Sequence, residues 1–123
     1  MPKVCFLPIG NNSNSLREFK SELDKQHKNS LIVYLSNTLI ALEKYGFEIN
    51  QKYKRDTLKK LDKELYEIRI KNMRLMMYFD GDNFFVILHG FIKKTQKTPQ
   101  IEIKNAKKEI QRWKSMKNVN WLA

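Results

Sequence analysis

The sequence predicts an α+β fold in which a strand and two helices precede an antiparallel sheet, and one helix follows it. Three observations predict this fold: apolar residues at helical spacing over 16–42, strand-like alternation over 65–91, and helical spacing again over 103–113. The chain has 123 residues, of which 41% are hydrophobic and 30% charged, so it can bury a modest core. Without a repeat or a linker, residues 1–123 are expected to form a single domain.

The first half of the chain is expected to form a strand and two helices. Residues 4–7 have the pattern of a short strand, and 10–15 that of a polar turn. Ser15 with Glu18 three residues later is typical of a capping box at the start of the first helix. Asn29-Ser30 is expected to cap the second helix, and Tyr45-Gly46 to end it. Residues 50–62 are polar and basic, so we expect a loop there with one helical turn at most.

Three strands of an antiparallel meander are predicted over 65–70, 73–79 and 84–91. Lys71-Asn72 and the run 80–83 are the turn signals between them. Counting from these turns sets Arg69 opposite Arg74, and Arg74 opposite His89. Alternation then places these three side chains in a row on one face, with Tyr78 further along it. The opposite face, which includes Leu75 and Leu88, is expected to be core.

The final helix is predicted to start at Thr98, as N-cap, and Pro99, as first helical residue. Its apolar stripe consists of Ile103, Ala106, Ile110 and Trp113. We expect this stripe to pack on the sheet and the lysines off it to face solvent.

The row of Arg69, Arg74 and His89 has two interpretations. Adjacent arginines repel each other unless an anion lies between them, and a phosphate suits the bidentate guanidinium fork. A histidine beside the phosphate could act as general acid or base, with a pKa lowered by the cations. Alternatively, Glu67 on the same face neutralises Arg69, and the row is structural.

The charge of the chain favours a polyanionic partner. The net charge is +11, and residues 89–123 alone hold nine basic and two acidic residues. Lys93, Lys94 and Lys97, with Thr95 among them, precede a helix N-terminus, which itself favours anions. The alternative is a solvated loop that serves solubility. Tyr78 is the aromatic residue we expect to stack on an RNA base.

Several function classes are disfavoured. Cys5 is the only cysteine, so no intrachain disulfide forms and no zinc cluster is expected. The sequence predicts no cofactor and no metal. We expect no signal peptide, because the apolar run at the start is short and bracketed by prolines, and no membrane span, because no apolar run approaches the required length. A cytoplasmic location is expected.

Several segments resemble the RelE/HigB toxin superfamily, most closely its phage-derived HigB-like branch. They are residues 42–46 (Leu-Glu-Lys-Tyr-Gly), 65–69 (Leu-Tyr-Glu-Ile-Arg), 73–75 with 78–79, and 87–99, with Ile103 and Ala106. The Gly-Phe-Ile-Lys-Lys-Thr-Gln-Lys-Thr-Pro run over 90–99 is the most specific of them.

The resemblance implies a RelE-like fold and a toxin of a type II toxin–antitoxin pair. Similar toxins cleave mRNA in the ribosomal A site without a metal, by attack of the 2′-hydroxyl on the adjacent phosphate. By position, Arg69, Arg74, His89, Lys93 and Lys94 match the catalytic basic residues. RNA contacts are expected from the neighbouring side chains Tyr78, Thr95, Lys97, Lys104, Lys107 and Lys108.

The expected partners are the ribosome, mRNA and a helix-turn-helix antitoxin. The toxin is expected to bind operator DNA only through this antitoxin. The chain departs from many relatives at its C-terminus, where they carry a catalytic tyrosine or acidic–aromatic pair and this chain has a lysine-rich helix. Two other functions stay open: a non-enzymatic ParE-like poison of DNA gyrase, and a basic RNA-binding module without catalysis.

Overall fold

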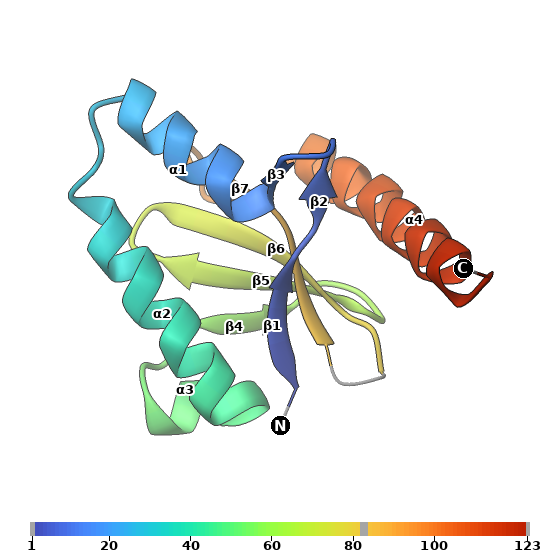
Figure 1. Ribbon diagram of the computed structural model, residues 1–123. Coiled ribbons are helices and arrows are strands. Elements are labelled where there is room, and N and C mark those ends of the chain that lie inside the picture. The colour runs from blue at the N-terminus through green and yellow to red at the C-terminus, as the bar shows by residue number, and fades with distance from the viewer. Residues whose placement is uncertain (1, 82–83, 123) are drawn as a thin grey trace.

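A mixed β-sheet lies between two helices on one face and a long helix on the other in the computed structural model of the chain (Figure 1). The structure describes residues 2–81 and 84–122, with side chains as far as residue 116. The predicted α+β class, with its antiparallel meander and closing helix, is confirmed. No helix in the described ranges combines the length and the hydropathy that crossing a bilayer requires.

The main sheet of the described residues has the strand order β1-β7-β6-β5-β4. β1 pairs in parallel with β7, and the other neighbours are antiparallel. The strand bounds are β1 Lys3–Phe6, β4 Leu58–Lys60, β5 Leu65–Ile70, β6 Met73–Phe79 and β7 Phe84–Ile92. A small separate hairpin joins β2 (Pro8–Ile9) to β3 (Ser13–Asn14), and only β3 and the turn lie within the predicted turn region.

The predicted register holds for the first hairpin and fails for the second. Arg69 lies opposite Arg74, as expected. A β-bulge at Met76/Met77 shifts the pairing of β6 with β7, so Arg74 faces Phe91 and His89 faces Met76. The predicted Arg74–His89 pair is therefore wrong for two reasons. The ladder next to the turn pairs Phe79 with Phe85 and not with Phe84, and the bulge then shifts the pairing by one more residue. Residues 82 and 83 of that predicted turn lie outside the described part of the chain.

Two hydrophobic cores fill the space on either side of the sheet. The core under the first two helices includes Phe19, Leu23, Leu35, Leu42, Ile68, Leu75, Phe85 and Ile87. The core under the last helix includes Leu65, Met76, Tyr78, Val86, Leu88, Ala106 and Ile110. Leu75 and Leu88 thus lie on opposite faces, contrary to the predicted alternation, because the ladder next to the turn pairs Phe79 with Phe85 and not with Phe84. Both faces of the sheet are buried.

The cap predicted for the first helix is wrong, and the one predicted for the second helix has the right position but no side-chain hydrogen bond. α1 (Ser15–Lys25) is capped by Asn14, whose side chain accepts a hydrogen bond of 2.9 Å from the Arg17 amide. The buried Ser15 hydroxyl instead donates to the Ile87 carbonyl of β7 at 2.6 Å. α2 (Leu31–Tyr45) starts without a side-chain cap from Ser30 and ends at Gly46, which has the expected positive φ of 57°.

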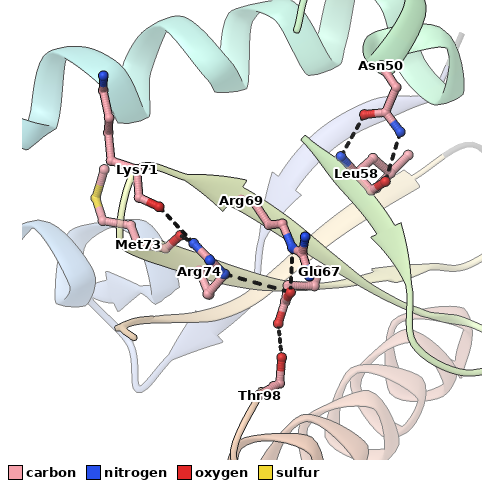
Figure 2. Close-up of polar contacts among 8 residues, drawn as sticks. All are labelled: Asn50, Leu58, Glu67, Arg69, Lys71, Met73, Arg74 and Thr98. Atoms are coloured by element: carbon pink, nitrogen blue, oxygen red, sulfur yellow. Dashed lines mark hydrogen bonds and ion pairs between the residues drawn. The ribbon is translucent and has the colours of Figure 1, made fainter. Parts of the chain in front are cut away.

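The segment predicted as a loop with one helical turn over 50–62 contains that turn and, in addition, a strand. After the 3-10 helix η1 (Gly46–Glu48), the chain forms the short helix α3 (Ile49–Lys52) and then the edge strand β4. The Asn50 side chain accepts from the Leu58 amide at 2.8 Å and donates to the Leu58 carbonyl at 2.9 Å (Figure 2). The sequence did not predict β4 because it is an edge strand with two exposed lysines and therefore lacks an apolar alternation.

The last helix, α4 (Gln100–Leu122), covers the other face of the sheet (Figure 1). Its predicted apolar stripe packs on the sheet as expected, with Ala106 and Ile110 buried. It begins two residues after Thr98, and the Glu102 amide donates to the Pro99 carbonyl. Thr98 is therefore not the side-chain cap that the sequence predicted; its hydroxyl reaches the sheet instead.

Candidate anion-binding site

An open pocket lined by cations lies where the β5–β6 turn meets the segment after β7. We call it the basic pocket; its volume is about 530 Å³. It is lined by Lys71, Asn72, Arg74, Lys93, Lys94, Thr95 and Gln96. None of these described lining residues is acidic, so the pocket presents four positive charges without a carboxylate among them. Its size suits a phosphate with an attached sugar.

The antiparallel pairing of β6 and β7 brings the two parts of the basic pocket together. In an antiparallel pair, the start of one strand lies beside the end of the other. The Lys93 amide accordingly donates to the Asn72 carbonyl at 2.7 Å, which fixes the start of residues 93–97, the lysine loop, against the hairpin turn. Lys71 occupies this turn with a positive φ of 57°.

Arg74 is the cation that the fold holds most firmly. Its Nη1 donates to the carbonyls of Lys71 and Met73 at 2.9 and 2.8 Å, so the guanidinium braces the turn (Figure 2). Its buried Nε has no hydrogen-bond partner among the described residues. Burial, together with Arg69, lowers the pKa of Arg74 despite the opposing effect of Glu67. A bound anion would offset the positive charges of Arg74 and Arg69.

Glu67 supplies a carboxylate between the two arginines. Its side chain is fully buried, and its Oε1 lies 3.1 Å from Arg69 Nε and 3.8 Å from Arg74 Nε. Its Oε2 accepts from the Thr98 hydroxyl (Figure 2). Burial opposes ionisation, but the hydrogen bonds from Thr98 and Arg69 outweigh it and lower the pKa of Glu67. The alternative in which Glu67 neutralises Arg69 is therefore what the structure shows.

Lys93 is the lysine whose pKa is most affected by its neighbours in the basic pocket. The pKa of Lys93 is lowered, first by desolvation and then by the positive charge of Arg74. A lysine of this kind releases its proton more readily than an ordinary surface lysine. Lys94 and Lys97 are exposed, and the Thr95 hydroxyl donates to the Lys97 carbonyl at 2.9 Å, which orders the loop internally.

His89 lies outside the basic pocket and contacts α4. Its Nδ1 lies 2.5 Å from Glu109 Oε1, and its Nε2 lies 3.0 Å from Glu102 Oε1. Burial disfavours the charged imidazole, but the two carboxylates outweigh it and raise the pKa of His89. The expected lowering by neighbouring cations is therefore wrong. In the part of the chain that the structure describes, no group of His, Cys, Asp and Glu side chains could hold a metal ion.

The sequence was compared with known proteins. Residues 17–111 match the model of the phage-derived Gp49-like proteins (DUF891). The chain belongs to this family. No curated protein matches the chain. The matched range of this Gp49-like chain runs from α1 into α4 and includes every residue that lines the basic pocket.

The structure brings together some of the predicted catalytic residues of this Gp49-like protein. Arg74, Lys93 and Lys94 line the basic pocket. Arg69 lies beside Arg74 but lines a different groove, on the α2 side of the turn. His89 shares their face of the sheet but is displaced along it by the shifted register of β6 and β7, and it is held by α4 instead.

The predicted RNA-contacting residues are also divided. Thr95 lines the basic pocket, whereas Lys97, Lys104 and Lys108 are exposed outside it. Lys107 forms an exposed ion pair with Asp62 at 3.1 Å. Tyr78 is on the predicted face but is only 6% exposed in the core under α4, so the interpretation of its ring as a stacking surface is wrong.

Lys71, Asn72 and Gln96 were missed as site residues because the sequence marked them only as turn or loop. The signal was available: a hairpin turn lies at the same sheet end as the residues that follow the third strand. Considering which residues share an end of the sheet, and not only which share a face, would have placed Lys71 beside Lys93.

Proposed function

We propose that this Gp49-like protein is a RelE/HigB-type toxin of a type II toxin–antitoxin pair, which cleaves mRNA on the ribosome. The observation that carries the proposal is the basic pocket, in which four cations, among them the braced Arg74, surround a space that suits a phosphate with an attached sugar. Family membership and the excess of positive charge near the C-terminus support a polyanionic substrate.

The chemistry of the pocket suits cleavage of RNA through its own 2′-hydroxyl. That oxygen attacks the adjacent phosphorus, the bond to the 5′ oxygen of the next nucleotide breaks, and a cyclic phosphate forms. The 2′-hydroxyl proton must leave and the departing oxygen must gain one. Arg74, Lys71 and Lys94 would stabilise the charge that develops on the phosphate. Lys93, whose pKa is lowered, would exchange the proton.

The proposed partners follow from this role. An antitoxin encoded beside the toxin, with a helix-turn-helix domain, would neutralise it and carry the complex to operator DNA. The exposed lysines of α4 would contact ribosomal RNA or an acidic antitoxin segment. Ribosome binding that weakens steeply with salt would support the RNA contact.

The test is to express the chain under tight control and map mRNA ends in the arrested cells. Cuts in phase with codons on translated messages support the proposal. Intact mRNA with induced DNA damage would favour a gyrase poison. Intact mRNA without DNA damage would favour a binding module without catalysis.

Arg74→Ala tests the pocket. We expect it to reduce cleavage at least 100-fold, because loss of one preorganised charge-stabilising donor costs on the order of 10²–10³ in rate. Arg17→Ala, at an exposed arginine on α1, is the matched control and should cleave normally. Circular dichroism must show that both variants fold. A folded Arg74→Ala protein that still cleaves at the normal rate would exclude the basic pocket as the active site.

A further inference from the structure

A second cationic surface lies on the α2 side of the β5–β6 turn. Lys52, Tyr53, Lys54 and Arg55 are consecutive and exposed, from the last residue of α3 onward. Tyr53 is 44% exposed, and Tyr34 of α2, close by, is 46% exposed. We call Tyr34 with residues 52–55 the aromatic-basic surface. Exposed rings among cations are the features with which proteins bind single-stranded RNA.

A narrow groove connects the two tyrosines with the sheet. It is lined by Tyr34, Thr38, Tyr53, Lys54, Thr57, Arg69, Ile70 and Lys71. Its volume is about 30 Å³, which is room for one or two waters and not for a base. A base at this surface would therefore stack on the exposed rings at the rim of the groove.

Hydrogen bonds hold the aromatic-basic surface against the edge of the sheet. The paired bonds between Asn50 and Leu58 tie α3 to β4. The Thr57 hydroxyl donates to the Lys54 carbonyl at 2.8 Å, and the Thr57 carbonyl accepts from the Arg69 amide at 2.7 Å. Tyr53 thus has a fixed backbone position, so a stacked base would not have to order it first.

Lys71 joins this surface to the basic pocket. Its side chain extends toward α2 (Figure 2), and its ammonium lies 4.6 Å from the centre of the Tyr34 ring. It lines both the groove and the basic pocket. A strand of RNA with one phosphate in the basic pocket would therefore meet the aromatic rings with a neighbouring nucleotide.

We propose that the aromatic-basic surface binds single-stranded RNA next to the cleaved phosphate, with a base stacked on Tyr53 and a flanking phosphate on Lys54 and Arg55. This inference rests on the proposed function, because it takes the basic pocket as the site of the reacting phosphate. Stacking tolerates any base, so the surface adds affinity and orientation and not sequence preference.

The test is equilibrium binding of the whole chain to a labelled single-stranded oligonucleotide of about eight nucleotides. Its 2′ oxygens are methylated, so that it cannot be cleaved. Tyr53→Ala should weaken binding roughly 5- to 150-fold, the equivalent of one stacked base. Tyr53→Phe should bind like the unaltered chain, because the ring stacks without its hydroxyl. Val33→Ala, at an exposed α2 residue that does not line the groove, is the control.

An abasic oligonucleotide of the same length separates stacking from charge. On it, Tyr53→Ala and the unaltered chain should bind equally. Three results would overturn the inference. Tyr53→Ala and the unaltered chain bind the normal oligonucleotide equally, or Tyr53→Ala loses as much affinity for the abasic oligonucleotide as for the normal one. The third is that the unaltered chain does not bind the normal oligonucleotide. The mapping of mRNA ends in cells judges cleavage separately, so failure here is distinguishable from failure of the proposed function.

Discussion

Replacing Glu67 with glutamine tests whether the buried carboxylate holds the sheet arginines and the start of α4 together. The substitution keeps the size of the side chain and removes its charge. Glutamine can still accept from Arg69 with its oxygen, but it then presents an amide group to Thr98. The two partly buried guanidinium groups lose the countercharge of Glu67, whose own side chain is fully buried.

The expected cost follows from these contacts. Each hydrogen bond that involves a charged group contributes about 1.5–3 kcal/mol. The Glu67 carboxylate accepts two such bonds, one from Arg69 and one from Thr98. Breaking a buried ion pair costs about 3–5 kcal/mol. Because glutamine retains part of the hydrogen bonding, we expect Glu67→Gln to lower the free energy of unfolding by about 3 kcal/mol.

Urea denaturation at pH 7 measures this difference, and Glu64→Gln is the matched control. Glu64 pairs with Lys114 at 3.4 Å, but both side chains are more than 40% exposed. Exposed pairs contribute about 0–1 kcal/mol, so the control should change little. Equal effects of the two substitutions would refute the reasoning.

The dependence on pH provides a second check of the same prediction. The pKa of Glu67 is lowered in the folded chain. Its stabilising contribution is therefore present above its ordinary pKa of about 4.5 and is lost as pH falls through the lowered value. The difference between the unaltered chain and Glu67→Gln should shrink at acid pH. A difference that stays constant down to pH 2 would contradict the assigned charge.

Two further predictions concern β7. Gly90→Ala should destabilise the fold by about 1–3 kcal/mol in urea denaturation, because an added Cβ would lie 2.6 Å from the Phe19 ring and 2.8 Å from Leu75; a Phe19→Leu background should reduce the loss, and an unchanged midpoint would contradict the close packing. His89→Gln should destabilise the chain at pH 5 and progressively less as pH rises. The pKa of His89 is raised in the folded chain, so the stabilisation from its pairing with Glu102 and Glu109 is complete below the ordinary pKa of about 6.5 and is lost as pH rises through the raised pKa. Unfolding free energies of both proteins from pH 5 to 9 measure this, and a constant difference would be the contrary result.

Local patterns predicted most of the fold. Alternation and turn residues located β5 and β6 to the residue and set the Arg69–Arg74 pair, because a two-residue turn leaves only one register. Helical spacing located α2 and α4. The bulge at Met76/Met77 could not be predicted, because no glycine or proline marks it and apolar residues fill both faces of β6.

The site was predicted in outline but not in its arrangement. The lysine loop and Arg74 follow from charge and register. The position of His89 depended on the register next to the turn and on the bulge. Its glutamate partners lie 13 and 20 residues further along, on a helix whose packing the sequence does not specify. Tyr53 was hidden in a segment interpreted as a loop, since the hydrogen bonds that order it link Asn50 and Thr57 to backbone atoms.

The lysine loop is anchored at both ends, at Asn72 by the Lys93 amide and at Glu67 by the Thr98 hydroxyl. Fixing the backbone of one residue costs about 1–2 kcal/mol in conformational entropy. The backbone of the lysine loop is already ordered in the folded chain, so anion binding does not add this cost. Only the lysine side chains remain to be ordered when an anion arrives. Weakening either anchor should therefore reduce anion affinity through entropy, even though every charge in the pocket stays in place.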